Sequence, residues 1–376
     1  MSESELLKQL DNVQTVGDRS TRDLAQTAAA LGSWLQARMP DASDVSVFDL
    51  SWPVGAGMSN ETILFRARWD RAGKTEQQGL VARLAPNVVQ FFMDADLRKQ
   101  FDLLKALHDG GHVKVAEPLW FETDASLLGL PFYVMRRLEG RVPVSFPPYN
   151  KSGFVFDATP AQRNTLWRTA MEGLCSIATT PEAAVRDVMA MPDKGETGFE
   201  QHLTYWREAR AWAMGDTAPF FQEAEAWFDK HCPDNAPAGL SWGDARMGNM
   251  MFGPDFRLAG VMDWEQASIG GPMFDLGWWL SFDKFHSSAM GLERLEGLGT
   301  RRDTFDMWRD LTGYSVADIE WYEAYAGYTL GVIVARRYSE PGAERPGHNR
   351  NNNMYTRHAA ELMGVAAPQD VVLNPA

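Results

Sequence analysis

The spacing of apolar residues changes near residue 140, and this change constrains the fold more than any other feature of the chain. Before it, short runs rich in β-branched and aromatic residues alternate with polar turns, which is typical of strands. After it, apolar residues recur at three- and four-residue steps over longer segments, which is typical of helices. The sequence therefore predicts an α+β protein, with a small sheet first and a larger, mainly helical part second.

The first part is expected to form a small antiparallel five-stranded sheet with one inserted helix. We predict strands at 45–50, 62–69, 79–84, 115–121 and 132–137, and the helix at 91–108. Residues 70–74 are polar and predict a hairpin turn. Ahead of the sheet, apolar residues at helical spacing stop at Pro40 and predict a helix, which we expect to pack on the sheet.

The second part is expected to be helical. We predict helices at 160–177, 198–212, 219–231 and 354–363, further helical segments after Pro272, and a loop over 340–353. A chain of 376 residues is long enough to bury a core in each part. We therefore expect three regions, namely a helical extension over 1–44, a sheet lobe over 45–138 and a helical lobe over 139–376.

Charge and cysteine content limit the partners and the compartment. The formal net charge of −14 excludes nucleic acid as the main partner, because no excess of Lys and Arg exists to neutralise phosphates. Cys175 and Cys232 lie far apart and lack metal-binding spacing, so we expect neither a disulfide nor a zinc site. No run of about 18 apolar residues occurs, and no basic segment leads into an apolar one at the start. We expect a cytoplasmic protein with no membrane partner.

One stretch concentrates oxygen-bearing side chains around a compact glycine-containing loop. It is LSWGDARMGNMMF, followed by LAGVMDWE, and it places Asp244, Asn249 and Asp263 where a loop and a hairpin can fold them into one site. Phosphoryl transfer needs groups that orient a hydroxyl, hold magnesium and offset charge on the phosphoryl group. We therefore expect Asp244 to accept or orient the substrate hydroxyl, and Asn249 and Asp263 to bind Mg²⁺. Arg246 is expected to lie against the transferring phosphate.

These motifs resemble the catalytic segment of the aminoglycoside phosphotransferase and choline kinase-like family, whose pattern is His-Gly-Asp, four residues, Asn, then a strand ending in a metal-binding Asp. The resemblance covers about residues 45–340. It is strongest to the branch with acyl-CoA dehydrogenase-linked phosphotransferase domains and mycobacterial relatives, where GDxRxGN, DWE and DLxW recur, matched here at 243–249, 263–265 and 275–278. The resemblance implies a bilobal protein-kinase-like fold, with an N-lobe that binds ATP or GTP with Mg²⁺ and a catalytic, substrate-binding C-lobe.

Three further residues gain expected roles from this resemblance. Trp242 stands where the family has His, and we expect it to support the loop by packing. Asp275 is expected to be a buried organiser of the catalytic loop and a cap for the next helix. Glu265 is expected to adjoin the metal or the substrate, or alternatively to form an ion pair with a nearby Arg.

The expected nucleotide-binding residues lie in the sheet lobe. The glycine-containing segment VGAGMSNET joins the first two predicted strands, where kinase-like folds cover the phosphates; an ordinary hairpin turn is the alternative. Its candidate residues are Gly55, Gly57, Met58 and Ser59. Arg83 stands where most kinases have a phosphate-binding Lys, unless it is a solvent-facing strand residue. Near the usual position of its acidic partner lie Gln100, Asp96 and Asp102.

The last predicted strand leads into the expected hinge, whose backbone would bind the adenine edge. Its candidates are Met135, Arg137 and Leu138. In the helical lobe, four residues are candidates to line the substrate cleft, although aromatics at helical spacing more often belong to a core. They are Trp206, Arg210, Trp278 and Asp283.

The expected activity is transfer of the γ-phosphoryl group of ATP or GTP to a hydroxyl of a small molecule. The absence of Asp-Phe-Gly and Ala-Pro-Glu segments disfavours a protein substrate. The dehydrogenase-linked relatives favour a metabolite such as a hydroxyacyl thioester. Two alternatives are an aminoglycoside or other antibiotic kinase, and a nucleotide-binding pseudokinase with a regulatory role.

Overall fold

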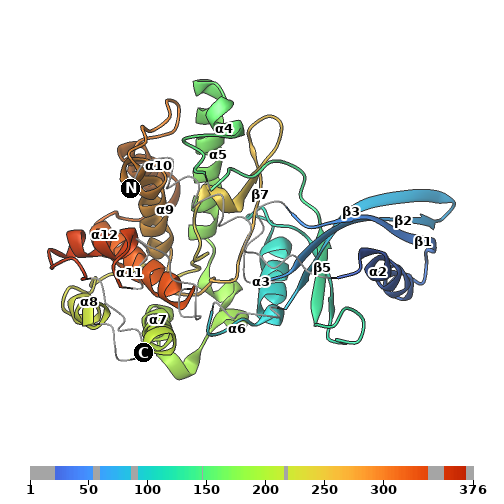
Figure 1. The fold of residues 1–376 in the computed structure, drawn as a ribbon, viewed down its shortest axis with the longest axis horizontal. Helices are drawn as coiled ribbons and strands as arrows, with labels where there is room; N and C mark the ends of the chain where they lie inside the picture. Colours follow the sequence, from blue (N-terminus) through green and yellow to red (C-terminus); the bar gives the residue numbers. More distant parts are fainter. Residues whose placement is uncertain are drawn as a thin grey trace, which may run out of the picture. The chain divides into compact units, whose positions relative to one another are not determined.

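The computed structural model describes residues 22–53, 60–85, 92–145, 147–215, 219–337 and 351–369. The chain divides into two compact units. The first, here called the sheet unit, comprises Met1–Gln90 and Asp94–Gly140; the second, the helical unit, comprises Phe91–Met93 and Arg141–Ala376. Both are drawn in Figure 1.

The sheet unit contains, within the described residues, the predicted five-stranded antiparallel sheet in the order β1-β2-β3-β5-β4. Its strands are β1 (Ser43–Ser51), β2 (Thr62–Arg71), β3 (Lys74–Leu84), β4 (Pro118–Glu122) and β5 (Phe132–Arg136). Strands β2 and β3 pair without interruption from Thr62 opposite Arg83 to Arg71 opposite Lys74. Their turn is Ala72-Gly73, both at positive φ, as a two-residue hairpin turn requires.

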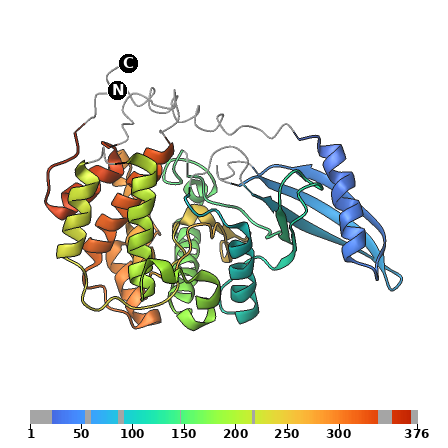
Figure 2. The ribbon, with the colours of Figure 1, turned by 90° about the horizontal axis from the view of Figure 1, so that it is seen from below.

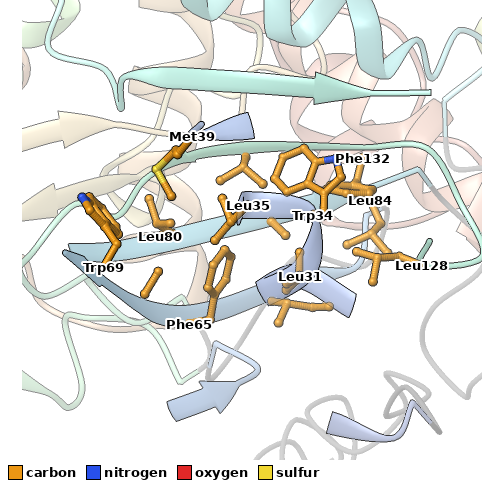
Figure 3. Close-up of a cluster of buried hydrophobic side chains, with 14 of the residues drawn as sticks. Leu31, Trp34, Leu35, Met39, Phe65, Trp69, Leu80, Leu84, Leu128 and Phe132 are labelled. Atoms are coloured by element: carbon orange, nitrogen blue, oxygen red, sulfur yellow. The ribbon is translucent and has the colours of Figure 1, made fainter. Parts of the chain in front are cut away.

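Helix α2 (Leu24–Arg38) covers one face of this sheet, and its position is clear in Figure 2. The predicted helical periodicity is confirmed, because Leu31, Trp34 and Leu35 are buried in the cluster shown in Figure 3. The ring of Trp34 lies 5.0 Å from that of Phe132. The helix therefore belongs to the same compact unit as the sheet, and residues 1–21 of the predicted extension lie outside the described residues.

Helix α3 (Leu97–Gly110) follows β3 and starts later than the predicted residue 91. The side chain of Asp96 accepts hydrogen bonds from the backbone N–H groups of Arg98 and Lys99, so it caps the helix at this point. Asp102 pairs with Arg98 along the helix surface. Asp96 and Asp102 thus each have a local partner in α3.

The helical unit is built mainly from helices, as predicted. Its helices of ten or more residues, within the described part of the chain, are α5 (Pro160–Ala178), α7 (Gly198–Met214), α8 (Pro219–Lys230), α9 (Met273–Phe285), α10 (Arg301–Thr312), α11 (Ile319–Arg337) and α12 (Met354–Met363). Helix α11 is largely buried and packs against α7, α9 and α12. Thr159 and Thr197 form capping boxes that start α5 and α7.

A short antiparallel ladder, β6 (Met250–Phe252) with β7 (Leu258–Val261), completes the helical unit. Helix α5 packs against β7. Among the described residues, no helix is both long and apolar enough to cross a membrane.

Candidate active site

The β6–β7 ladder brings the two ends of the motif region together. Met250 pairs with Val261, and the backbone N–H of Met262 donates to the carbonyl oxygen of Asn249 at 2.9 Å. Asn249 and Asp263 therefore lie at the same end of one hairpin, although fourteen positions separate them. Antiparallel pairing alone produces this proximity.

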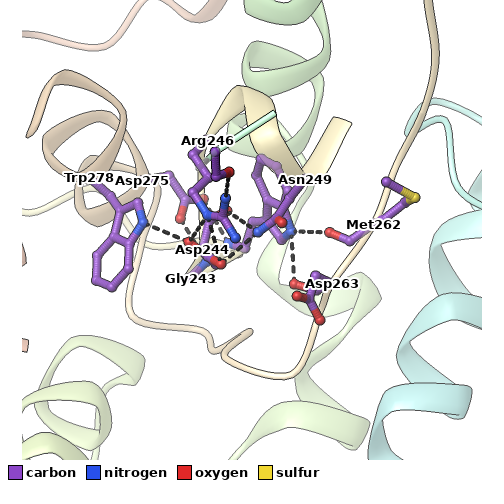
Figure 4. Close-up of polar contacts among 10 residues, drawn as sticks. Gly243, Asp244, Arg246, Asn249, Met262, Asp263, Asp275 and Trp278 are labelled. Atoms are coloured by element: carbon purple, nitrogen blue, oxygen red, sulfur yellow. Dashed lines mark hydrogen bonds and ion pairs between the residues drawn. The ribbon is translucent and has the colours of Figure 1, made fainter. Parts of the chain in front are cut away.

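The carboxylate of Asp244 lies at the centre of a hydrogen-bonded group (Figure 4). Its Oδ1 accepts from Arg246 Nε at 2.9 Å and from Trp278 Nε1 at 3.0 Å. Its Oδ2 accepts from Asn249 Nδ2 at 2.6 Å. Arg246 and Asn249 belong to the loop that carries Asp244, whereas Trp278 belongs to α9, so the loop and a helix distant in sequence fix one carboxylate.

Arg246 is itself held in place. Its Nη1 donates to Ser145 Oγ at 2.7 Å, and its guanidinium lies 5.5 Å from the centre of the Phe282 ring. The guanidinium of Arg246 is thus paired with the carboxylate of Asp244. Ser145 lies 101 residues upstream of Arg246, and no sequence signal indicated this contact.

Asp275 fixes the backbone of the loop that carries Asp244. It is 1% exposed and accepts hydrogen bonds from Ser241 Oγ and from the backbone N–H groups of Trp242 and Gly243, at 2.9, 2.7 and 2.9 Å. Burial raises its pKa to about 6, against the lowering effect of these hydrogen bonds. The prediction that Asp275 caps the helix is wrong, because α9 starts after Pro272 and Asp275 is inside its first turn. From that position the carboxylate faces the loop.

Trp242 joins the loop to the strand end that carries Asp263. It is fully buried, and its Nε1 donates to the carbonyl oxygens of Met262 at 2.9 Å and Asp263 at 3.2 Å. Its ring also packs against Trp264, with the centroids 5.9 Å apart. Trp242 therefore makes specific hydrogen bonds in addition to the packing expected of it.

Two loop positions have unusual backbone requirements. Gly243 has φ 93°, and a Cβ there would lie 2.4 Å from the carbonyl oxygen of Gln266, so only glycine fits. Asp263 has φ 61°, which is uncommon for a residue other than glycine but is tolerated best by Asn and Asp. Such backbone conformations concentrate at functional sites.

Asn249 and Asp263 suit the coordination preference of Mg²⁺. This ion takes hard oxygen ligands, usually one or two from the protein, with phosphate and water completing the shell. The amide nitrogen of Asn249 donates to both the backbone carbonyl and the carboxylate of Asp244, so its side-chain oxygen is the atom suited to a metal. No cluster of three or more His, Cys, Asp or Glu side chains suited to a metal occurs in the described ranges. The pair fits a metal that also binds the phosphates.

The remaining candidates of the helical unit have varied surroundings. Arg210 forms a two-point ion pair with Glu225, which links α7 to α8. Asp283 pairs with Arg294 at 3.0 Å. Trp206 lines a small cavity beside the loop that carries Asp244, together with Gly243, Gln266 and Trp278 among others. Glu265 lies two residues beyond Asp263 and is partly buried. Of the four residues predicted to line a substrate cleft, Trp278 is the one that hydrogen-bonds to Asp244.

The nucleotide-binding candidates either lie in the sheet unit or fall outside the residues that the structure describes. Gly55, Gly57, Met58 and Ser59 lie outside the described residues. Arg83 is partly buried on β3, opposite Tyr133 of β5, and Met135 of β5 is opposite Val81. The backbone N–H of Arg137 donates to Gly79, and Leu138 follows it. Their binding roles stay predictions.

Comparison with solved structures establishes the fold as kinase-like. A Ralstonia eutropha protein assigned as an aminoglycoside phosphotransferase superposes with a TM-score of 0.65 at 20% identity, covering 89% of this chain and 98% of that one. A macrolide 2'-phosphotransferase of type I superposes with a TM-score of 0.54 at 17% identity, covering 93% and 99%. At such identities the likeness shows the fold alone. The kinase-like fold, together with the family match of residues 53–312, identifies the chain as a small-molecule kinase.

Residues 53–312 match the model of the phosphotransferase enzyme family, and the chain belongs to this family. Among curated proteins, human acyl-CoA dehydrogenase family member 11 is 28% identical over 236 residues, which are 59% of this chain and 28% of that protein. Mouse acyl-CoA dehydrogenase family member 10 is 26% identical over 223 residues, which are 59% and 19%. The chain thus matches less than a third of the length of these relatives.

Proposed function

We propose that this protein transfers the γ-phosphoryl group of ATP or GTP to a hydroxyl of a small metabolite, with Mg²⁺ as cofactor. The observation that carries the proposal is the position of the Asp244 carboxylate, which three N–H donors orient next to Asn249 and the Asp263 strand end. A kinase site needs such a fixed carboxylate to orient the attacking hydroxyl. The family membership supports the same reaction class.

The residues then have distinct roles. Asp244 accepts a hydrogen bond from the acceptor hydroxyl and takes up its proton as the oxygen bonds to the γ-phosphorus, while the bond from that phosphorus to the nucleoside diphosphate breaks and the diphosphate leaves. Arg246 neutralises part of the carboxylate charge in the resting site, and its guanidinium would offset charge on the transferring phosphoryl group. Asn249 and Asp263 hold Mg²⁺, and that ion, when bound, offsets charge on the phosphate oxygens.

The acceptor that we favour is a metabolite such as a hydroxyacyl thioester. Both relatives reported above are acyl-CoA dehydrogenase family members by name, and a kinase segment in such proteins would act on an acyl substrate. An aminoglycoside is polycationic and would need unpaired acidic groups. The acidic candidate Asp283 already has Arg294 as its partner, which favours an uncharged or anionic acceptor.

The test is Mg²⁺- and nucleotide-dependent phosphate transfer across a panel of hydroxyacyl-CoA esters, amino alcohols, aminoglycosides and macrolides. We expect transfer to a hydroxyacyl ester and its loss in Asp244→Asn, which keeps the size of the side chain but removes the carboxylate. Asp255→Asn is a matched control, since Asp255 lies in the exposed turn between β6 and β7. Nucleotide binding without turnover on any acceptor, and with Asp244→Asn unchanged, would establish a pseudokinase instead.

A further inference from the structure

Helix α9 presents two side chains to the catalytic loop from one face. Asp275 and Trp278 are three positions apart, which places them on the same side of a helix. Asp275 accepts hydrogen bonds from the loop backbone, whereas Trp278 donates one to the Asp244 side chain (Figure 4). The same turn of helix therefore fixes both the loop and the reactive carboxylate at its tip.

The indole ring of Trp278 is held in a fixed orientation by burial and ring stacking. The side chain is 5% exposed, and its ring stacks on that of Phe282 with the centroids 5.7 Å apart and the planes 28° apart. The Nε1–H group is its one hydrogen-bond donor and has a direction set by the ring. A buried indole N–H without an acceptor is unfavourable, so the ring and the carboxylate constrain each other.

The hydrogen bonds to Asp244 also determine how many acceptor sites of its carboxylate remain for a substrate hydroxyl. A carboxylate offers about four lone-pair sites. In the described part of the chain, three N–H groups occupy sites on these oxygens: those of Asn249 and Trp278, and that of Arg246 Nε, which is shared between Oδ1 at 2.9 Å and Oδ2 at 3.1 Å. Roughly one site is left for an acceptor hydroxyl, and its direction depends on the rotation of the carboxylate, which the three donors set together.

We propose that Trp278 is a positioning residue for phosphoryl transfer, whose indole N–H fixes the rotation of the Asp244 carboxylate so that the remaining acceptor site faces the substrate hydroxyl. The proposal rests on the function proposed above for Asp244. It differs from a substrate-contacting role because Trp278 acts through Asp244 and touches no reacting atom. Loss of the N–H then slows the chemical step without weakening nucleotide binding.

The test is Trp278→Phe, which keeps an aromatic ring in place but removes the donor. We expect kcat to fall about tenfold, the loss of one charge-assisted hydrogen bond, with the nucleotide Kd close to that of the unmodified protein. The unfolding midpoint should fall to a similar extent in Trp278→Phe and in Trp279→Phe, because a smaller ring leaves space at a buried position. Trp279→Phe is the matched control, because Trp279 is the next residue of α9, equally buried at 5%, and faces a different side of the helix. An unchanged kcat in Trp278→Phe, or an equal loss of kcat in Trp279→Phe, would overturn the proposal.

A double-mutant cycle separates positioning from packing. In an Asp244→Ala background no carboxylate remains to be oriented, so Trp278→Phe should cause no further loss in the residual rate, measured with radiolabelled nucleotide. Additive losses would mean that Trp278 acts only through general packing.

An NMR measurement tests the hydrogen bond without activity. In ¹⁵N-labelled protein, the indole signal that disappears in Trp278→Phe belongs to Trp278, and it should shift in Asp244→Ala. A signal that does not respond to Asp244→Ala would exclude the contact. An unmodified protein that transfers no phosphate to any acceptor would contradict the proposed function, whereas an active protein with normal Trp278→Phe kinetics would contradict the positioning role alone.

Discussion

The indole Nε1 of Trp242 lies 3.2 Å from the carbonyl oxygen of Asp263, so the residue before Gly243 and Asp244 is hydrogen-bonded to the backbone of the expected metal-binding residue. The same N–H also reaches the carbonyl oxygen of Met262 at 2.9 Å. The family resemblance places a histidine at this point, which is a smaller donor. The tryptophan therefore supplies a hydrogen bond across the site while it fills the space behind the loop with a larger ring.

Replacing Trp242 by Phe should weaken both stability and metal binding. The change leaves the backbone oxygens of Met262 and Asp263 without this donor and removes ring volume in a fully buried position. We expect the free energy of unfolding to fall by about 1–3 kcal/mol in urea titrations, and the Mg²⁺-nucleotide Kd to rise. Trp264→Phe is the control, because Trp264 is buried in the same cluster but donates to Val261. It should reduce stability alone.

Replacing Asp263 by Asn should weaken Mg²⁺-nucleotide binding about tenfold or more while the protein stays folded. The change removes a charged oxygen ligand, yet Asn tolerates the positive φ of this position. Calorimetric titration with nucleotide, in Mg²⁺ and in chelator, measures the difference directly. Asp318→Asn is a matched control, since Asp318 has a similar φ of 59°. Equal affinity in the two variants would refute the metal role of Asp263.

Replacing Arg83 by Met should raise the nucleotide Kd about tenfold, the value of one charged hydrogen bond at roughly 1.5–3 kcal/mol. Met keeps much of the apolar stem, so the partly buried position on β3 should stay packed. Arg68→Met, at an exposed position of β2, controls for the general loss of positive charge from the sheet unit. A normal Kd in Arg83→Met would assign Arg83 to an ordinary strand position.

Buried histidines should make the protein sensitive to acid. Burial lowers the pKa of His202 from 6.5 to about 3, and that of His286 also to about 3, where burial is joined by the charge of Arg246. The unfolded chain binds these protons from pH 6.5 downward and the folded chain does not, so stability is complete above pH 6.5 and falls as the pH drops towards 3. At pH 5 each histidine should cost about 2 kcal/mol.

Urea unfolding at pH 7.5 and pH 5 measures this loss. The variant His202→Asn should show a smaller loss between the two pH values, because Asn has no proton to bind and can still hydrogen-bond Ser268. His112→Asn, at an exposed position, should behave as the unmodified protein does. Identical pH dependence in both variants would count against the buried, neutral state of His202.

Local patterns predicted most of the secondary structure. Ile63, Phe65, Ala67 and Trp69 alternate with more exposed residues along β2, so a strand with one buried face follows from the sequence. The start of α3 was misplaced, because the apolar residues before Asp96 extend the helical pattern, whereas the Asp96 side chain caps the helix and ends that extension. Helix boundaries depend on such single hydrogen bonds more than on periodicity.

The spacing of Asp244, Asn249 and Asp263 was sufficient to predict that they belong to one region, because a short hairpin must return the chain to its start. The spacing of the motif could not predict which distant residues hydrogen-bond to Asp244 and Arg246. The contacts of Trp278 with Asp244 and of Ser145 with Arg246 join residues 34 and 101 positions apart. Asp275 was predicted to organise the loop and to cap α9. The cap was an error, because α9 begins after Pro272 and Asp275 therefore lies within its first turn.

The amino-acid sequence determined the strand and helix pattern, the family and the three side chains of the expected chemistry, since these depend on neighbours close in the chain or on short motifs. The tertiary structure decided which groups orient the Asp244 carboxylate, which hydrogen bonds Trp242 makes and which charged candidates are already paired. Those contacts join segments far apart in sequence, and their geometry follows from how α9 and the β6–β7 ladder pack around one loop.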